Sequence, residues 1–151
     1  MDFSFEINLK TREIFYQILN SHTLNQLNKI PKGYSNNIFW NIKHIVITQQ
    51  LLVYGLSQLP LNISEVEVNS YKRGTRPNRD INDKDLVLLK KQLFSTLKQT
   101  KEDFKKHLFK DYTEYTVTTK TTLTNVEDAI EFNNFHEGIH LGYVLALKRL
   151  I

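Results

Sequence analysis

The sequence predicts an all-α fold, a four-helix bundle, on three observations. Four long segments carry apolar residues at helical spacing, and residues that favour helix ends flank several of them. A loop of about twenty residues, with proline and glycine, separates the second segment from the third. The 151 residues suit one domain spanning 1–151, and 40% apolar with 24% charged residues is typical of a globular chain.

The first predicted helix covers about residues 4–21. A short helical turn over residues 22–29 follows, before Pro31 interrupts the pattern. Apolar residues at the outer positions of the first two predicted helices, such as Ile7 and Ile14, are compatible with a dimer surface or with the core, and the sequence leaves both open.

The second helix starts near Ser35 or Asn36, because either side chain can accept a hydrogen bond from the free N–H groups of a first turn. It is expected to run to Leu59 and to stop at Pro60. Residues 60–80 are predicted as a long loop, which inside a compact domain is often functional.

The third helix is predicted over residues 83–107. Residues 112–122 are rich in threonine, whose β-branched side chain disfavours helix, so an extended connection with a little strand is expected. Thr124 and Glu127 have the spacing of a capping box, and the fourth helix is predicted from Asn125 to nearly the end of the chain.

Composition excludes several classes of site and location. The chain has no cysteine, so disulfides and thiolate ligands are excluded and any metal site must use histidine, carboxylate or neutral donors. No apolar run reaches the ~18 residues of a membrane span, and no signal peptide is recognisable. We therefore expect a soluble, cytoplasmic protein without membrane contacts.

A cluster of basic side chains lies in the predicted loop. The net charge is +4, and Lys72, Arg73, Arg76 and Arg79 follow one another closely. A nucleic-acid partner is not expected, because acidic residues are interspersed along the chain and no base-reading motif is present.

The fourth predicted helix contains the pair of residues with the strongest chemical signal, His136 and His140. Residues four apart lie ~40° apart on one helical face, so both imidazoles can reach one metal ion. The same face carries Ala129, Phe132 and Tyr143, so we expect the pair at the centre of the buried stripe. Buried imidazoles need partners, and a metal supplies one.

The segment also matches the zinc-protease pattern His-Glu-x-x-His, in which the glutamate acts on a metal-bound water. Glu137, however, lies about 100° around the helix from His136. A catalytic role and a contact with solvent or a neighbouring helix both stay open for this side chain.

His44 in the second helix is the candidate for a third ligand. Its face mixes Trp40, expected to pack, with small polar groups and a glycine, as the wall of a wet pocket does. Three histidines would leave an open coordination position, which distinguishes catalytic from structural metal sites. Asn41, Thr48 and Asn133 are candidates for orienting the imidazoles or a substrate.

Three segments, residues 36–44, 71–77 and 132–142, resemble the DinB-like superfamily of metal-binding four-helix bundles, in the order found in that family. The resemblance implies one ligand histidine in the second helix and two in the fourth, which correspond to His44, His136 and His140. It also implies that the match to the protease pattern is confined to residues 136–140, because the fold of this superfamily differs from that of the zinc proteases. Members bind zinc, nickel or similar ions and often form homodimers, so one divalent ion and a homodimer are expected here.

Characterised relatives in this superfamily include transferases and isomerases that activate a low-molecular-weight thiol on the metal. The resemblance therefore implies a metal-dependent enzyme of the thiol-transferase or hydrolase type, acting on a small-molecule substrate or thiol. The alternative is a non-catalytic metal- or small-ligand-binding protein of the same fold. The sequence decides neither the metal nor the reaction, nor whether the chain is an enzyme.

Overall fold

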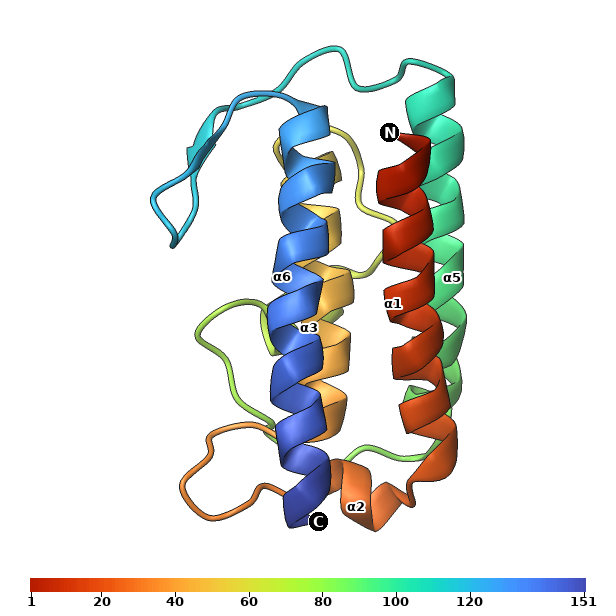
Figure 1. The fold of residues 1–151 in the computed structure, drawn as a ribbon, viewed down its shortest axis with the longest axis vertical. Coiled ribbons are helices and arrows are strands. Elements are labelled where there is room, and N and C mark those ends of the chain that lie inside the picture. Colours follow the sequence, from red (N-terminus) through yellow and green to blue (C-terminus); the bar gives the residue numbers. More distant parts are fainter.

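Four long helices dominate the structure. The computed structural model describes residues 1–151 and is mostly helical, so the predicted all-α class is confirmed. The long helices are α1 (Asp2–Ser21), α3 (Ile38–Gln50), α5 (Asp83–Lys105) and α6 (Val126–Leu147). They run side by side (Figure 1), with α1 and α3 each packed against both α5 and α6. None of the helices is both long and apolar enough to cross a membrane.

Shorter elements connect and extend the long helices. A π-helical turn, η1, continues α3, and two short strands form an antiparallel hairpin before α6. The expectation of an extended connection with a little strand is thereby confirmed. The short elements are α2 (Leu24–Asn28), η1 (Leu51–Gly55), α4 (Glu65–Tyr71), β1 (Tyr115–Thr116), β2 (Thr122–Leu123) and the 3-10 turn η2 (Lys148–Leu150).

The start of α6 differs by one residue from the predicted capping box. The Asn125 side chain accepts a hydrogen bond from the Asp128 N–H, at 2.8 Å. The Asp128 carboxylate in turn accepts hydrogen bonds from the backbone N–H and hydroxyl of Thr124. Both Thr124 and Asn125 can cap a helix, so the sequence allowed two registers, and the prediction of Thr124 with Glu127 chose the wrong one.

The segment predicted as a long loop contains α4. Its first turn is closed by a capping box in which the Ser64 hydroxyl accepts from the Glu67 N–H, and the Glu67 carboxylate accepts from the Ser64 N–H. A helix of seven residues is too short to show apolar periodicity, although the spacing of Ser64 and Glu67 was a readable signal.

Buried polar contacts fasten α4 to the long helices. The ammonium group of Lys43, a residue only 3% exposed, lies 2.5 Å from the Glu67 carboxylate and also donates to Gln92. Burial by itself raises the pKa of Glu67, but the hydrogen bonds from Lys43, Ser64 and Gln92 outweigh it and lower that pKa to about 2. Glu67 therefore stays ionised, and it holds α4 against α3 and α5.

A fully buried ion pair joins three of the four long helices. Arg12 of α1 and Glu137 of α6 are both 0% exposed, and the guanidinium Nη2 donates to the carboxylate Oε1 over 2.9 Å. Arg12 also donates to the Leu93 carbonyl and the Thr96 hydroxyl of α5, and Asn133 donates to Glu137. Glu137 is therefore an inter-helix contact, one of the two roles that the sequence left open.

Removing one member of this pair should be costly. In Arg12→Met the Glu137 carboxylate stays buried without its countercharge, so we expect a loss of about 3–5 kcal/mol in the free energy of unfolding, measured by urea denaturation. The double variant Arg12→Met/Glu137→Leu should lose less, because neither charge is left buried. Lys10→Met, which removes an exposed pair with Glu13, serves as the control and should change little. Equal losses in the single and double variants would contradict the account.

Candidate metal centre

Three imidazole rings converge between α3 and α6. His44 projects from α3, and His136 and His140 project from successive turns of α6. One ring nitrogen of each lies within 4.8 Å of the others, a separation at which they could hold one metal ion. The ring centroids are 4.6 Å apart for His136 and His140, and 5.3 and 4.9 Å from His44 to each of these. The sequence spacing thus does bring the three side chains together.

The α6 histidines are half-buried at the edge of the helix's buried face, not at its centre. Asn133 and Glu137 are the more deeply buried residues on α6, and Tyr143, expected on the buried stripe, is 40% exposed. The ion pair from Glu137 to α1 sets this rotation of α6, which turns the histidines towards α3 and the solvent boundary.

Hydrogen bonds fix the orientation of the His44 ring. Its Nδ1 lies 2.7 Å from the backbone carbonyl oxygen of Tyr71, at the end of α4. Because a carbonyl only accepts, Nδ1 carries the hydrogen and Nε2 keeps the lone pair that a metal requires. The Thr48 hydroxyl lies 3.2 Å from Nε2, and the Trp40 ring stacks on the imidazole at 4.7 Å between centroids.

The two α6 histidines differ in their partners. Nδ1 of His140 lies 2.9 Å from the Asn41 side-chain oxygen, while the Asn41 amide group donates to the Asn37 carbonyl. This arrangement again leaves Nε2 of His140 with a lone pair. His136 has no hydrogen-bond partner in the protein, and its Nδ1 is buried. A neutral nitrogen donor set with one unsatisfied ring fits a bound divalent ion.

Two of the three polar residues predicted to support the site contact a histidine. Asn41 and Thr48 do so, whereas Asn133 donates to Glu137 on the buried side of α6. Trp40 packs as expected, and it packs on His44 itself. The Tyr71 carbonyl was missed, because a backbone acceptor contributed by a distant segment leaves no signal in the side-chain pattern.

A pocket of about 450 Å³ opens onto His44 and His136. Its walls come from the end of α3, η1, α6 and the β1–β2 hairpin, and half of the lining residues are apolar. This combination of apolar walls and a few polar groups is typical of small-molecule sites. The remaining lining residues include Thr48, Gly55, Arg73, Tyr115 and Thr118.

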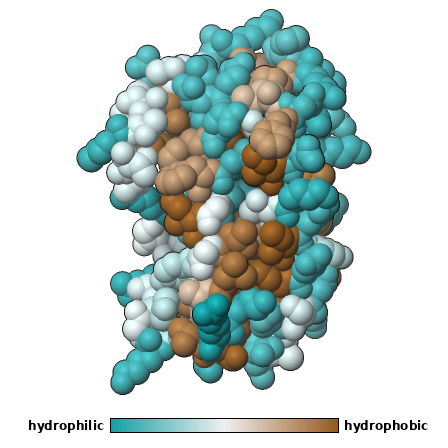
Figure 2. Space-filling model, viewed as in Figure 1, coloured by the Kyte–Doolittle hydropathy of each residue, from teal (hydrophilic) through white to brown (hydrophobic).

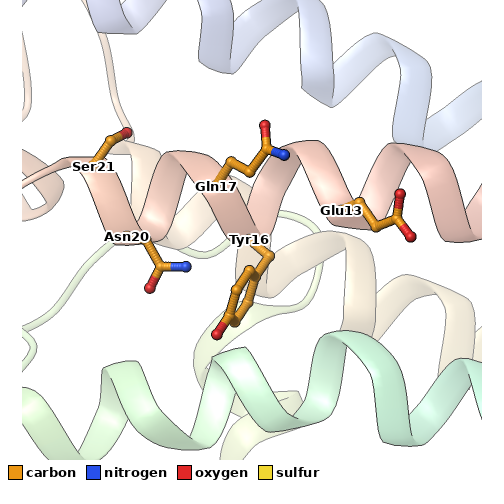
Figure 3. Close-up of a pocket in the computed structure, with 5 residues that line it drawn as sticks. All are labelled: Glu13, Tyr16, Gln17, Asn20 and Ser21. Carbon is orange, nitrogen blue, oxygen red and sulfur yellow. The ribbon is translucent and has the colours of Figure 1, made fainter.

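A second hollow, on α1, offers no comparable chemistry. Glu13, Tyr16, Gln17, Asn20 and Ser21 line it, and all five side chains project from that single helix (Figure 3). No histidine contributes to it, and no cluster of potential metal ligands includes its single carboxylate.

Burial keeps the three imidazoles neutral. Loss of solvation lowers the pKa of His44, although the hydrogen bond to Tyr71 opposes this shift. Loss of solvation, with repulsion from the neighbouring histidines, lowers the pKa of His136 to about 4 and that of His140 to about 3. At neutral pH all three rings therefore have a lone pair available for a ligand.

The fold and this cluster define a mostly helical protein with a histidine site that could hold a metal ion. A family model of the DinB superfamily matches residues 9–144, which is most of the chain. The chain therefore belongs to the DinB superfamily, as its sequence motifs indicated. No significant match to a curated protein accompanies this family match.

The lowered pKa values predict how acid affects the metal-free protein. The unfolded chain binds protons on His136 and His140 below pH ~6.5, whereas the folded chain does not until about pH 4 and 3. The free energy of unfolding should therefore fall as the pH drops from 6.5 to 5, by up to about 1.4 kcal/mol per pH unit for each histidine.

In the double variant His136→Gln/His140→Gln, the free energy of unfolding should depend much less on pH between 6.5 and 5. Urea titrations at several pH values measure this dependence. Above pH 7.5 the wild type and the variant should show parallel pH dependence, which is the internal control. An unchanged slope between pH 6.5 and 5 in the variant would show that these histidines are not buried in their neutral form.

Proposed function

We propose that this chain is a metal-dependent enzyme of the thiol-transferase or hydrolase type, built on a DinB-like four-helix bundle that forms one domain over residues 1–151. The observation that carries the proposal is the convergence of three neutral imidazoles, two of which, His44 and His136, line a pocket of the size of a small-molecule site. Imidazole ligands suit zinc and nickel, so one such ion per chain is the proposed cofactor.

His44, His136 and His140 would hold the ion, which would supply Lewis-acid chemistry by lowering the pKa of a bound water or thiol. The residues of the chain would position the reaction. Asn41 and the Tyr71 carbonyl hold two imidazoles by their Nδ1–H groups. The Thr48 hydroxyl, 3.2 Å from Nε2 of His44, is placed to donate to a ligand next to that ring. The apolar pocket walls limit the access of water.

The second candidate is a non-catalytic metal- or small-ligand-binding protein, and one observation favours it. No aspartate or glutamate lines the pocket, and Glu137, the nearest carboxylate in sequence to the histidines, is paired with Arg12. A general acid or base would then have to come from the substrate, from a thiol or from a metal-bound water. Turnover in a screen that combines low-molecular-weight thiols with electrophiles would remove this candidate.

Metal content tests the proposed site directly. Protein purified without added metal should contain about one zinc or nickel ion per chain by mass spectrometry. His44→Ala and His136→Ala should each lose most of it, since removing a ligand from a three-histidine site weakens binding strongly. The control His107→Asn changes an exposed histidine with φ 55°, which asparagine tolerates, and should keep the metal. Absence of metal in the wild type after reconstitution would refute the metal site.

We also propose that the chain forms a homodimer through the outer faces of α1 and α6. Figure 2 shows apolar side chains gathered on the side of the molecule that these two helices form. Ile7 and Ile14 are 40% and 41% exposed, so they do not belong to the core, and Phe135 and Ile139 are 52% and 51% exposed. An apolar face of this kind on one side of a protein is typical of an interaction surface.

The glycines of α6 agree with this proposal. Gly138 and Gly142 lie in a helix interior, where glycine costs roughly 0.5–1 kcal/mol relative to alanine. A Cβ added at either position would meet no atom of the same chain within 4 Å, so packing within the chain does not require them. Two residues without side chains on this face would allow the backbone of a second copy to approach α6 closely.

Light scattering after gel filtration should give the mass of two chains for the wild type. Ile139→Glu should give one chain, because it would bury an unpaired charge in the interface. The control Val87→Glu changes a 67% exposed valine on α5 and should leave the dimer intact. A monomeric wild type, or a dimer that survives Ile139→Glu, would contradict the proposed interface.

A further inference from the structure

The pocket beside the histidines contains one cation with no partner. Arg73 lines the pocket, is exposed and forms no ion pair or hydrogen bond with the protein. The neighbouring Arg79, by contrast, is engaged by both oxygens of the Asp85 carboxylate at 2.7 and 2.8 Å. A guanidinium at the wall of a pocket presents a planar fork of donors that matches a carboxylate or a phosphate.

Nothing in the pocket would repel an anion. Its lining contains no aspartate or glutamate, and the other polar groups are hydroxyls and imidazoles. Imidazole binds a metal in its neutral form, so a divalent ion held by three histidines would keep its full positive charge. Arg73 and the proposed metal site therefore give the whole pocket a positive potential.

The rest of the pocket is apolar. Leu51 and Leu52 line it from η1, and Leu56 lines it from the residue that follows η1. Phe132 faces the pocket from α6 and Val117 from the hairpin. A single small anion, such as inorganic phosphate, would leave these walls in contact with water. The volume of about 450 Å³ lies in the range of roughly 300–1,000 Å³ of small-molecule sites.

Gly55 supports this interpretation of the pocket as a built site. It ends the π-helical turn η1, a rare conformation that is frequent at functional sites. A Cβ at residue 55 would meet its own chain only at ordinary contact distances of 3.9 and 4.0 Å, so the fold does not require glycine there. Gly55 lines the pocket, so the absence of a side chain keeps the pocket open.

We infer that the pocket takes a small amphipathic anion, a molecule with an apolar body and one carboxylate or phosphate group that pairs with Arg73. The apolar body lies against the leucines of η1 and of the residue that follows it and against Phe132, and the site of reaction lies at the histidines. This inference names the substrate class of the proposed function and rests on it. Arg73 acts as the residue that selects a charged substrate over a neutral one.

Three probes of equal chain length test the inference by calorimetry: octanoate, octyl phosphate and 1-octanol. The zinc-loaded full chain should bind at least one of the two anions at least tenfold more tightly than 1-octanol. The stronger of the two identifies the preferred anionic group. Arg73→Gln should weaken anion binding at least tenfold and leave 1-octanol within twofold. The control Arg76→Gln, in the same loop but outside the pocket, should stay within twofold for every probe.

Gly55→Leu should abolish binding of all three probes, because it fills the pocket. Equal binding of 1-octanol and the anions would overturn the inference, as would anion binding that survives Arg73→Gln. Metal content and probe binding to the metal-free chain separate the two proposals. If the chain takes up no metal but still binds the anions through Arg73, the inference about the pocket holds and the proposal of a metal-dependent enzyme fails. Full metal content with no anion binding would refute the inference alone.

Discussion

The buried ion pair between Arg12 and Glu137 is the constraint on which the site depends. Two charges removed from water are tolerable only with nearly complete hydrogen bonding, and here Leu93, Thr96 and Asn133 supply it. The pair therefore admits one rotation of α6 about its axis. Because His136 and His140 lie on the neighbouring face of the same turns, that rotation directs both imidazoles at α3. The position of the histidine cluster is thus set by contacts between residues outside the cluster.

A second polar network supports the same centre from the other side. Lys43 and Gln92 hold Glu67 and with it α4, and the carbonyl of Tyr71 at the end of α4 orients His44. The segment that follows brings Arg73 to the pocket. The region predicted as a long loop is therefore an anchored segment, which orients one candidate ligand, His44, and contributes to one wall of the pocket. Its polar anchors explain how a short helix without a single fully buried residue can fix the orientation of the His44 ring.

The sequence was sufficient for the helical class and for the three histidines, because a spacing of four on one helix constrains geometry strongly. It was insufficient for the rotation of α6. That helix carries apolar residues on most sides, including the exposed Phe135, Ile139 and Leu145, so its own pattern does not define the buried face. The pairing of Arg12 with Glu137 joins residues 125 positions apart, and no local spacing reveals it. The pocket walls from η1 and the hairpin depend on long-range packing in the same way.

The central claim is that three histidines hold one divalent ion and leave a coordination position open towards the pocket. X-ray absorption on the zinc-loaded protein, before and after addition of 2-mercaptoethanol, tests it most directly. The account predicts three imidazole nitrogens at about 2.0–2.1 Å and an exchangeable oxygen donor, which a sulfur at about 2.3 Å replaces when the thiol is added. A shell with fewer than three imidazoles, or one filled by protein ligands and unchanged by the thiol, would contradict it.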